Sequence, residues 1–411
     1  MLHQTLRLLL IALTPALLLV LAVLRGLRET RARLGRGLPS LPGGIWIHAA
    51  SVGEVNAVRP LVEAMLQRWP QRPLLLTTMT TTGLTAAGRI QGVQAHLVPL
   101  DLPFVMRAAM RRVRPDLLLL VETELWPEML RQAHRCGVPV AIVNGRLSAR
   151  SVRRYSRFGL LWRPLLRRLA VVGAQSRRDA RRYRLLWQPR AEDTGNLKFC
   201  VRFPGYDRDK LRREWSLRAD DFVVTFGSSR PGEEALLRDA LPQLRESAPG
   251  RLRVLLVPRH LNRLNEVSTA LQGADWAPRN ERRDAEVTVV DEMGVLVQAY
   301  ALADLALVGG SLLPGFGGHN PVEPTYFGVP TLMGPHHESC RDSVRTLREG
   351  GGLLIVKPDE LAGTLARLAA SPQERVALGE AGRGIVQANA QSVERNLAML
   401  QNVLDNHTTK W

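Results

Sequence analysis

Residues 45–68 read IWIHAASVGEVNAVRPLVEAMLQR and pass from an apolar run into a segment with helical periodicity. The run at residues 45–50 has the length and composition of a buried strand, and residues 57–68 place apolar side chains three and four positions apart. A strand that is apolar on both faces and leads into a helix is typical of a parallel sheet covered on both sides. This segment therefore predicts a doubly wound α/β domain.

The same alternation recurs along the chain in two series. The first series of expected strands covers residues 45–50, 74–78, 97–100, 117–121, 140–143 and 171–174. The second covers residues 222–226, 254–257, 287–290, 305–308, 331–333 and 353–356. A polar stretch at residues 200–220, with Pro204 and Gly205, separates the two series. We therefore expect two Rossmann-like domains that face an interdomain cleft, because such sheets bind ligands beyond the carboxyl ends of their strands.

Length, composition and charge agree with a globular protein of more than one domain. The chain has 411 residues, of which 45% are hydrophobic and 23% charged, and this excludes disordered, collagen-like and disulfide-scaffold proteins. Its net charge of +18 is uneven: residues 1–200 hold 31 basic and 11 acidic side chains (+20), and residues 201–411 hold 25 and 27 (−2). We therefore expect an acidic partner for the first half.

Cysteine and histidine spacing indicates neither a disulfide framework nor a metal site. The three cysteines, Cys136, Cys200 and Cys340, lie far apart, as in proteins of a reducing compartment. The nine histidines form no HxxxH or HExxH pattern. We expect no protein-bound metal and no cofactor.

The N-terminal segment is expected to bind the membrane. Residues 8–24 are interrupted only by Thr14 and Pro15, and this apolar run is at the short end of what spans a bilayer. No small-x-small cleavage site follows, which disfavours a cleaved signal peptide. Arg7 precedes the run and five arginines follow it, so the positive-inside rule keeps the body of the protein cytoplasmic. A buried or in-plane amphipathic helix is the alternative.

Glycine-rich loops follow several of the expected strands, at residues 48–54, 309–311 and 315–323. Glycines let backbone N–H groups approach an anion, and the N-terminus of a helix adds partial positive charge. These loops predict a phosphate site, although neither GxxxxGK[ST] nor GxGxxG is present.

Each candidate also has a purely structural explanation. Ser51 and Glu54 have the spacing of a capping box, and spacing alone favours a cap. The Asn-Pro-x-Glu sequence at residues 320–323 likewise suits an N-cap, a first helical position and the residue three further on. The two acids of residues 122–124 and the basic pair of residues 258–260 also suit solvated strand ends.

Thirteen arginines crowd residues 150–190. They suit a solvated helix face, but Phe158, Trp162, Leu165 and Leu166 lie between them, which equally suits a surface against anionic lipid. Only 5% of residues are aromatic and no RNP-type motif is present, so nucleic-acid binding is disfavoured.

Many motifs occur in one order over residues 45–335: HAASVGE, TTMTTTG, PLDLP, VETELWP, NGRLSARS, GNLKF, SSRPGEE, VPRH, DEMG, VGGS and GGHNPVEP. Together they resemble the 3-deoxy-D-manno-octulosonic acid (Kdo) transferases of Gram-negative bacteria. The resemblance implies a GT-B glycosyltransferase fold. It also implies inverting transfer of Kdo from CMP-Kdo to a hydroxyl of lipid A precursor (lipid IVA), without an essential metal, at the cytoplasmic face of the inner membrane.

On this resemblance we expect four segments. Residues 1–37 form a membrane anchor with a basic flank, and residues 38–205 form the acceptor-binding domain. Residues 206–390 form the CMP-sugar donor-binding domain, and residues 391–411 form a helix that packs back on the first domain. Lipid A precursor carries phosphates and lies in an anionic membrane, which would explain the positive first half.

The resemblance implies catalytic roles for Glu54, Glu122 and Lys198. Glu54 matches the general base of the family, and its place at a helix N-terminus would keep it ionised. Lys198 could offset negative charge on the departing phosphate or on the Kdo carboxylate, and Glu122 could orient the acceptor or hold a neighbouring cation. The expected acceptor-binding residues are Ser51, Gly53, Glu124 and Arg146.

The resemblance places CMP binding in the second half of the chain. Arg259 matches a phosphate contact, Met293 and Gly294 match contacts to the cytosine, and Glu323 could accept both ribose hydroxyls. The expected donor-binding residues are Ser228, Ser229, Arg230, Pro258, Arg259, His260, Met293, Gly294, Val295, Gly310, Ser311, Asn320, Pro321, Val322 and Glu323. Because CMP leaves with one phosphate, a helix dipole and a few cations could stabilise it without Mg²⁺.

Two positions depart from the family pattern. The family has Glu where Val295 stands and Asp where Cys200 stands, so any side-chain contact made by those acids would be lost here. Alternative functions are a GT-B enzyme for another nucleotide sugar, a nucleotide-sugar epimerase, and a non-catalytic Arg-rich binder of membrane or nucleic acid.

Overall fold

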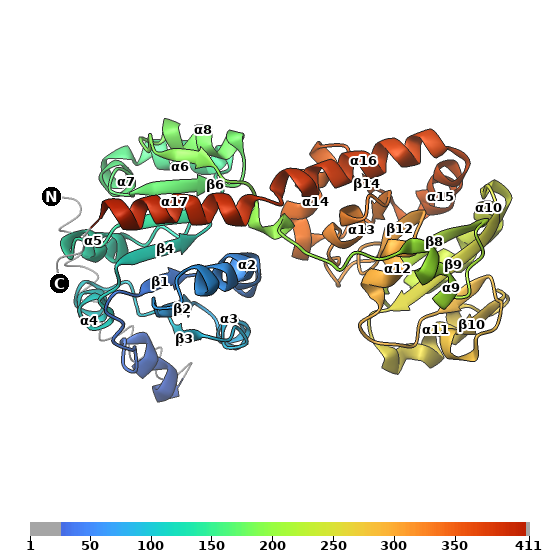
Figure 1. The fold of residues 1–411 in the computed structure, drawn as a ribbon, viewed down its shortest axis with the longest axis horizontal. Coiled ribbons are helices and arrows are strands. Elements are labelled where there is room, and N and C mark those ends of the chain that lie inside the picture. The colour runs from blue at the N-terminus through green and yellow to red at the C-terminus, as the bar shows by residue number, and fades with distance from the viewer. Residues whose placement is uncertain (1–25, 408–411) are drawn as a thin grey trace. The chain divides into compact units, whose positions relative to one another are not determined.

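The computed structural model describes residues 26–407, which form two compact α/β units (Figure 1). The first unit takes the described residues up to Cys200 together with those from Gln391 onward, and the second unit is Val201–Ala390. Each unit is built on a seven-stranded parallel sheet. The prediction of two doubly wound α/β domains is confirmed.

The first sheet has the strand order β3-β2-β1-β4-β5-β6-β7. Its strands are β1 (Ile45–His48), β2 (Leu74–Thr78), β3 (Val93–Leu97), β4 (Leu117–Val121), β5 (Val140–Gly145), β6 (Val171–Ala174) and β7 (Ala191–Asp193). Besides the helical residues 26–33, the helices described in this unit are α2 (Val52–Arg68), α3 (Thr81–Ala87), α4 (Pro103–Val113), α5 (Pro127–Arg135), α6 (Ala149–Arg157), α7 (Gly159–Leu166), α8 (Arg177–Leu185) and α17 (Ser392–Asn406). The strand order reverses between β1 and β4, so a ligand site is expected at their carboxyl ends.

The second sheet has the order β10-β11-β9-β8-β12-β13-β14. Its strands are β8 (Asp221–Ser229), β9 (Arg251–Pro258), β10 (Trp276–Pro278), β11 (Val287–Val289), β12 (Leu305–Val308), β13 (Thr331–Met333) and β14 (Leu354–Ile355). Its helices are α9 (Arg208–Glu214), α10 (Glu233–Ser247), α11 (Leu264–Ala270), α12 (Leu296–Leu302), α13 (Val322–Tyr326), α14 (Arg341–Glu349), α15 (Leu361–Ala370) and α16 (Pro372–Asn389). Here the order reverses between β8 and β12, which again marks the expected ligand site.

Alternating side chains of the central strands supply two hydrophobic cores, one on each face of the first sheet. In β1, Trp46 packs into the core on one face, and Ile45 and Ile47 pack into the core on the other. All residues of β1, β2, β4 and β5 are buried. Full burial stabilises the fold by roughly 1.5–3 kcal/mol for each large apolar side chain, so this sheet is a rigid base for the loops at its end.

The C-terminal helix α17 belongs to the first unit. Its Met399, Leu400 and Val403 lie in the core beside the central strands, and Trp69 Nε1 donates a hydrogen bond to Gln401 Oε1 at 2.8 Å. In Figure 1 this helix, drawn in red, runs along the first sheet. The first unit is thus completed by the last helix of the chain.

Three edge strands differ from the sequence-based expectation. The strand expected at residues 97–100 is β3, which ends at Leu97, and the short strands β7 and β10 were not expected. Edge strands are buried less completely; only Leu97 of β3 is buried, for example. An apolar run therefore does not mark them.

The expected membrane segment at residues 8–24 lies outside the described residues. Residues 26–33 are helical. Within residues 26–407, no helix combines the length and apolar character that crossing a bilayer requires.

Candidate active site

Glu54 lies at the carboxyl end of β1, in the first turn of α2. Ser51 caps this helix, and its Oγ accepts a hydrogen bond from the Glu54 N–H at 3.3 Å. The Glu54 carboxylate reaches back and accepts hydrogen bonds from the Ala50 N–H at 2.8 Å and the Ser51 hydroxyl at 3.0 Å. A capping box would bond the N–H of Ser51 instead. The cap is therefore present in a shifted form that fixes both carboxylate oxygens.

The environment of Glu54 makes it a better proton acceptor than an ordinary glutamate. Burial raises the pKa of Glu54 to about 7, and the negative charges of Glu122 and Glu124 add to this rise. The Ala50 N–H and the Ser51 hydroxyl act in the opposite direction. Burial therefore outweighs the effect of the helix N-terminus, which was expected to keep Glu54 ionised. A base with a pKa near 7 is well matched to proton transfer at neutral pH.

Glu122 and Lys198 form an ion pair beside this carboxylate. Glu122 follows β4, and Lys198 lies in the 3-10 helix Leu197–Phe199; Lys198 Nζ is 2.9 Å from Glu122 Oε1. Glu122 has a left-handed backbone conformation, with φ of 61°. A non-glycine residue costs roughly 1–2 kcal/mol in this conformation, and such strain concentrates at functional sites.

The end of β5 positions Lys198. Asn144 is buried there, and its Oδ1 accepts a hydrogen bond from the Leu197 N–H at 3.0 Å. Asn196 Oδ1 accepts another from the Lys198 N–H, also at 3.0 Å. The Asn144 bond fixes the 3-10 helix against the sheet, and the Asn196 bond caps that helix, so both help to position the lysine that pairs with Glu122.

The expected acceptor-binding residues surround the same strand ends. Glu124 Oε2 accepts a hydrogen bond from Trp126 Nε1 at 3.0 Å, and burial raises the pKa of Glu124. The Arg146 carbonyl follows β5 and accepts a hydrogen bond from the Thr123 hydroxyl. Gly53 is exposed beside Ser51 in the first turn of α2. The structure therefore brings the catalytic and acceptor candidates of the first unit to the switch point, where the strand order reverses between β1 and β4.

His48 also lies here, although no role was expected for it from the sequence. Its ring is buried at the end of β1, with Nδ1 3.1 Å from the Thr77 carbonyl and an edge-to-face contact to Trp126 at 5.9 Å between centroids. Burial lowers the pKa of His48 to about 4, and its Nε2 has no hydrogen-bond partner among residues 26–407. The signal was its place in the HAASVGE motif.

Cationic side chains gather at the carboxyl end of the second sheet. Arg230 Nε donates a hydrogen bond to His319 Nε2 at 3.4 Å, and Arg259 and His260 are exposed directly after β9. Burial lowers the pKa of His319 to about 4, and the charges of Arg259, Arg230 and His260 lower it further. The guanidinium of Arg230 also lies 5.2 Å from the ring centroid of Phe316. The two arginines and a neutral histidine make this end of the sheet suitable for an anion.

Glu323 lies close to this cluster. Burial raises its pKa, whereas the Asn320 amide, which donates to Glu323 Oε1 at 3.4 Å, and the charge of Arg259 act against the rise. Asn320 Oδ1 also accepts a hydrogen bond from the Val322 N–H at 3.1 Å. The helix α13 begins at Val322 rather than at Pro321, which is its N-cap, because the Asn320 side chain closes the turn one residue later than expected.

Several expected donor-site residues are buried parts of the framework. The hydroxyl of Ser229 donates to Glu234 Oε1 at 2.8 Å. The hydroxyl of Ser311 donates to the Val308 carbonyl at 2.5 Å and accepts from the Gly334 N–H at 2.8 Å. Six more members of this set are also buried: Ser228, Pro258, Val295, Gly310, Pro321 and Val322. In this structure the two hydroxyls support the loops rather than point to solvent.

Several members of this set lie in backbone turns. Ser228 and Gly310 have positive φ values of 60° and 67°, and a Cβ atom on Gly310 would approach the His319 ring to 3.0 Å. Met293 is 67% exposed, and Gly294 has φ of 86° just before α12. These positions let the backbone come close to a ligand, and their donor-binding roles stay predictions.

Glu233, which was not among the residues expected from the sequence, organises the donor-side loops. Its Oε2 accepts hydrogen bonds from the N–H groups of Gly310 at 2.7 Å and Arg230 at 2.9 Å. Its Oε1 accepts from the N–H groups of Ser311 at 2.9 Å and Leu312 at 2.8 Å. One buried carboxylate therefore joins the loops that follow β8 and β12.

Over residues 26–407, no three His, Cys, Asp or Glu side chains are arranged to hold a metal ion. The expectation of a metal-free enzyme stays a prediction.

Comparison with known proteins identifies the family. The sequence pattern of the 3-deoxy-D-manno-octulosonic-acid transferase (kdotransferase) family matches residues 27–201. A 3-deoxy-D-manno-octulosonic acid transferase of Haemophilus influenzae is 34% identical over 380 residues, covering 89% of this chain and 88% of that protein. The chain belongs to the Kdo transferase family. The Kdo transferase of Bordetella pertussis is also 34% identical, over 91% of each chain. The predicted family is confirmed, and this family member is a glycosyltransferase.

Solved structures agree on the fold. MurG of Acinetobacter baumannii has a TM-score of 0.58 to this Kdo transferase, at 14% identity over 88% of this chain and all of that one. At this identity the likeness shows the fold alone. The prediction of two parallel-sheet domains like those of GT-B glycosyltransferases is confirmed.

Proposed function

We propose that this chain transfers Kdo from CMP-Kdo to a hydroxyl of lipid A precursor, with inversion at the anomeric carbon. In this proposal the first unit binds the lipid acceptor and the second unit binds the nucleotide sugar. The observation that carries it is the arrangement of Glu54, Glu122 and Lys198 around the switch point of the first sheet. Family membership supports the proposed donor and reaction and does not favour an epimerase or a non-catalytic binder.

Glu54 acts as the general base in this reaction. Its carboxylate takes the proton of the acceptor hydroxyl as that oxygen attacks the anomeric carbon of Kdo. The hydrogen bonds from Ala50 and Ser51 hold the carboxylate in place at the end of β1. Burial favours the protonated form that results. Glu54 thus caps α2 before the acceptor binds, and the same side chain acts as the base once the acceptor is bound.

Lys198 stabilises negative charge that builds up in the transition state, on the departing CMP phosphate or on the Kdo carboxylate. A positioned cation in a partly buried site acts more strongly than it would in water. Glu122 holds the lysine at 2.9 Å and keeps it directed into the site. The pair therefore acts as one unit, with Glu122 as the positioning partner.

The second unit binds the CMP portion of the donor. Arg259 and Arg230 attract its phosphate, Glu323 accepts hydrogen bonds from the ribose hydroxyls, and the turn at Met293 and Gly294 faces the cytosine. Arginine is well suited to a phosphate because its guanidinium donates two parallel hydrogen bonds. With a single phosphate to stabilise, these cations replace Mg²⁺, and no metal is required.

The proposed location is the cytoplasmic face of the inner membrane, with residues 8–24 as the anchor. The acceptor is a membrane lipid that carries phosphates, which suits the net charge of +20 in residues 1–200 (31 basic and 11 acidic side chains).

The transfer reaction itself is the direct test. Detergent-purified full-length protein is incubated with freshly generated CMP-Kdo and a tetraacyl lipid A precursor, with and without EDTA, and products are identified by mass. We expect product at equal rates in both samples, with mass increments that count the Kdo residues added. Folded protein that binds CMP but forms no product would overturn the proposed donor–acceptor pair, and a loss of rate in EDTA would overturn metal independence.

The pH dependence of the reaction should report Glu54. Because burial raises the pKa of this carboxyl to about 7, the base is protonated below that pH and ionised above it. We therefore expect kcat/KM to fall about tenfold for each pH unit below pH 7 and to level off above it. Initial rates should be measured at subsaturating donor and acceptor from pH 5 to 9, about the range in which the protein is expected to stay folded. They would show the decrease in kcat/KM below pH 7. A flat profile between pH 6 and 8 would remove Glu54 from the role of base.

A further inference from the structure

The junction of α6 and α7 presents large apolar side chains to solvent. Phe158 is 55% exposed and Leu160 is 93% exposed, and both stand where one helix ends and the next begins. Single exposed apolar residues are common on protein surfaces. Two at one helix junction gain significance from the charges that surround them.

All charged residues in the sequence around these apolar side chains are basic. No Asp or Glu occurs between Glu128 and Asp179, whereas many arginines do. In α6 and α7 the exposed arginines include Arg153, Arg154, Arg157 and Arg163. Apolar residues surrounded by arginines have the composition of a surface that enters the interface of an anionic bilayer.

The exposed junction is firmly attached to the first unit. Tyr155, Leu165 and Leu166 are buried in the hydrophobic core on one face of the sheet. The rings of Tyr155 and Trp162 make an edge-to-face contact, with 4.9 Å between centroids. Phe158 and Leu160 are therefore held outward by a packed helix pair.

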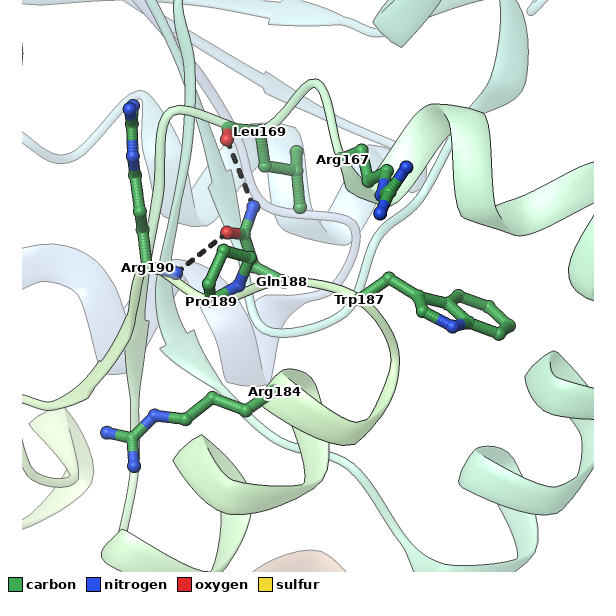
Figure 2. Close-up of a pocket in the computed structure, with 7 residues that line it drawn as sticks. All are labelled: Arg167, Leu169, Arg184, Trp187, Gln188, Pro189 and Arg190. Atoms are coloured by element: carbon green, nitrogen blue, oxygen red, sulfur yellow. Dashed lines mark hydrogen bonds between the residues drawn. The ribbon is translucent and has the colours of Figure 1, made fainter.

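A cationic pocket of about 650 Å³ lies next to α7. Its lining residues are Arg167, Leu169, Arg184, Trp187, Gln188, Pro189 and Arg190, and none of them, all within the described chain, is acidic. Figure 2 shows Arg167 and Trp187 toward one end of the pocket and Arg184 and Arg190 toward the other.

The side chain of Gln188 is held in place by hydrogen bonds within the pocket. The side chain is buried, and its Nε2 donates hydrogen bonds to the carbonyls of Leu166 and Leu169, both at 3.0 Å. Figure 2 shows the bond to Leu169. Its Oε1 accepts a hydrogen bond from the Arg190 N–H at 3.0 Å. The Arg184 guanidinium donates to the Ala191 carbonyl at 3.0 and 2.8 Å. The pocket is thus shaped by hydrogen bonds that do not need a ligand.

The pocket and the exposed junction form one surface. A Cβ atom on Gly159 would approach the Trp187 ring to 2.9 Å, so the ring packs closely on the first residue of α7. The Arg163 guanidinium lies 5.7 Å from the centroid of the same ring. Trp187 therefore connects the pocket to Phe158 and Leu160 on either side of Gly159.

We propose that this surface docks on an anionic bilayer. Phe158 and Leu160 enter the interface, the arginines of α6 and α7 meet lipid phosphates, and the pocket beside Trp187 takes the phosphate of one anionic lipid headgroup. Charge complementarity favours this occupant, because the surface combines apolar side chains with positive charge only. We name the α6–α7 junction together with this pocket the docking surface.

The docking surface is distinct from the catalytic site. Leu169 and Arg190 come just before β6 and β7, so the pocket lies at the amino ends of these strands. Glu54 and Glu122 follow the carboxyl ends of β1 and β4. The headgroup in the pocket is therefore a docking lipid rather than the acceptor. The inference rests on the proposed function only in placing the acceptor in a bilayer.

Hydrogen–deuterium exchange of the full-length protein tests the inference locally, so the N-terminal segment does not mask the result. The protein is mixed with phosphatidylcholine vesicles with or without phosphatidylglycerol. We expect peptides from residues 149–166 and 185–190 to exchange more slowly only on the anionic vesicles. A double variant, Phe158→Ser with Leu160→Ser, and a second, Arg167→Glu with Arg190→Glu, should each weaken this protection about tenfold or more, as judged by the lipid concentration required.

Arg89→Glu is the matched control, because this exposed arginine follows α3 at the opposite edge of the sheet and should leave the protection unchanged. Equal protection on both vesicle types, or none on either, would overturn the inference. So would equal protection by inorganic phosphate without vesicles, which would make the pocket a free-anion site. The exchange measurement does not depend on catalysis. Protection without Kdo transfer would contradict only the proposed function. Kdo transfer without protection would contradict only the proposed docking surface.

Discussion

Glu54→Gln is expected to lower kcat/KM for Kdo transfer by about 10²–10⁴-fold, which is the contribution typical of a general base. The substitution removes the proton acceptor and little else. A glutamine Oε1 can still accept from the Ala50 N–H, and its amide can donate to the Ser51 hydroxyl, so both ends of the present hydrogen-bond pattern have a counterpart. The shifted cap of α2 should survive while the chemistry is lost.

The same substitution should not lower stability at neutral pH. Because the folded-state pKa of Glu54 is about 7, above its usual 4.5, the folded protein holds this proton more tightly than the unfolded chain. The stability from this carboxyl is fully present below pH 4.5 and is lost as pH rises through 7. A neutral glutamine avoids that loss of stability, which amounts to at most about 3 kcal/mol. Tm at pH 8 should stay the same or increase.

Steady-state rates and thermal unfolding of the two proteins would check both halves of this result. Glu63→Gln is the control, because Glu63 is exposed on the same helix and should change neither rate nor Tm. Full activity in Glu54→Gln would leave this residue with its capping role alone. A large decrease in Tm would show that the carboxylate itself, rather than the hydrogen-bond pattern, holds the turn.

The sequence predicted a strand well only where both faces of that strand are buried. The run LLLLV at residues 117–121 coincides with β4, because a strand buried on both faces has an uninterrupted apolar sequence. In β3 only Leu97 is buried, and Gln94 is exposed at the sheet edge, so the expected strand was placed too late. Periodicity thus predicted the central strands and misplaced or missed the edges.

The candidate site was predictable only where a motif marked it. From spacing alone, Glu54 was better explained as a cap, and the structure shows that the cap and the buried carboxylate are the same group. The Glu122–Lys198 ion pair joins residues far apart in the sequence, and only the parallel order of β4 and β5 brings them together. No local pattern could predict that contact.

Glu233 illustrates the remaining limit. It stands in SSRPGEE, where it resembles any acid in the first turn of a helix. Its role comes from four backbone N–H groups, three of which lie in the loop after β12 and one in the loop after β8. Backbone donors have no sequence signature, so the convergence was visible only in the folded chain.

Glu233→Ala should therefore be among the most damaging substitutions in the second unit. It leaves four N–H groups without their acceptor, and each unsatisfied buried donor costs roughly 1–3 kcal/mol. Water entering the space would recover part of this, so we expect a loss of about 4 kcal/mol or more in the free energy of unfolding of this unit. Because the loop residues Arg230 and Gly310 also form the expected donor site, CMP affinity should fall at least about tenfold.

Thermal unfolding and CMP titration of Glu233→Ala, Glu233→Gln and the control Glu246→Ala would measure this effect; Glu246 is exposed near the end of the same helix. Glutamine keeps one oxygen for two of the four donors but turns its NH₂ group toward the other two. Stability should thus decrease in the order wild type, glutamine, alanine. If both variants matched wild type in Tm and CMP binding, the loops after β8 and β12 would hold their positions without the carboxylate. The donor site would then depend on packing around His319 and Phe316 rather than on Glu233.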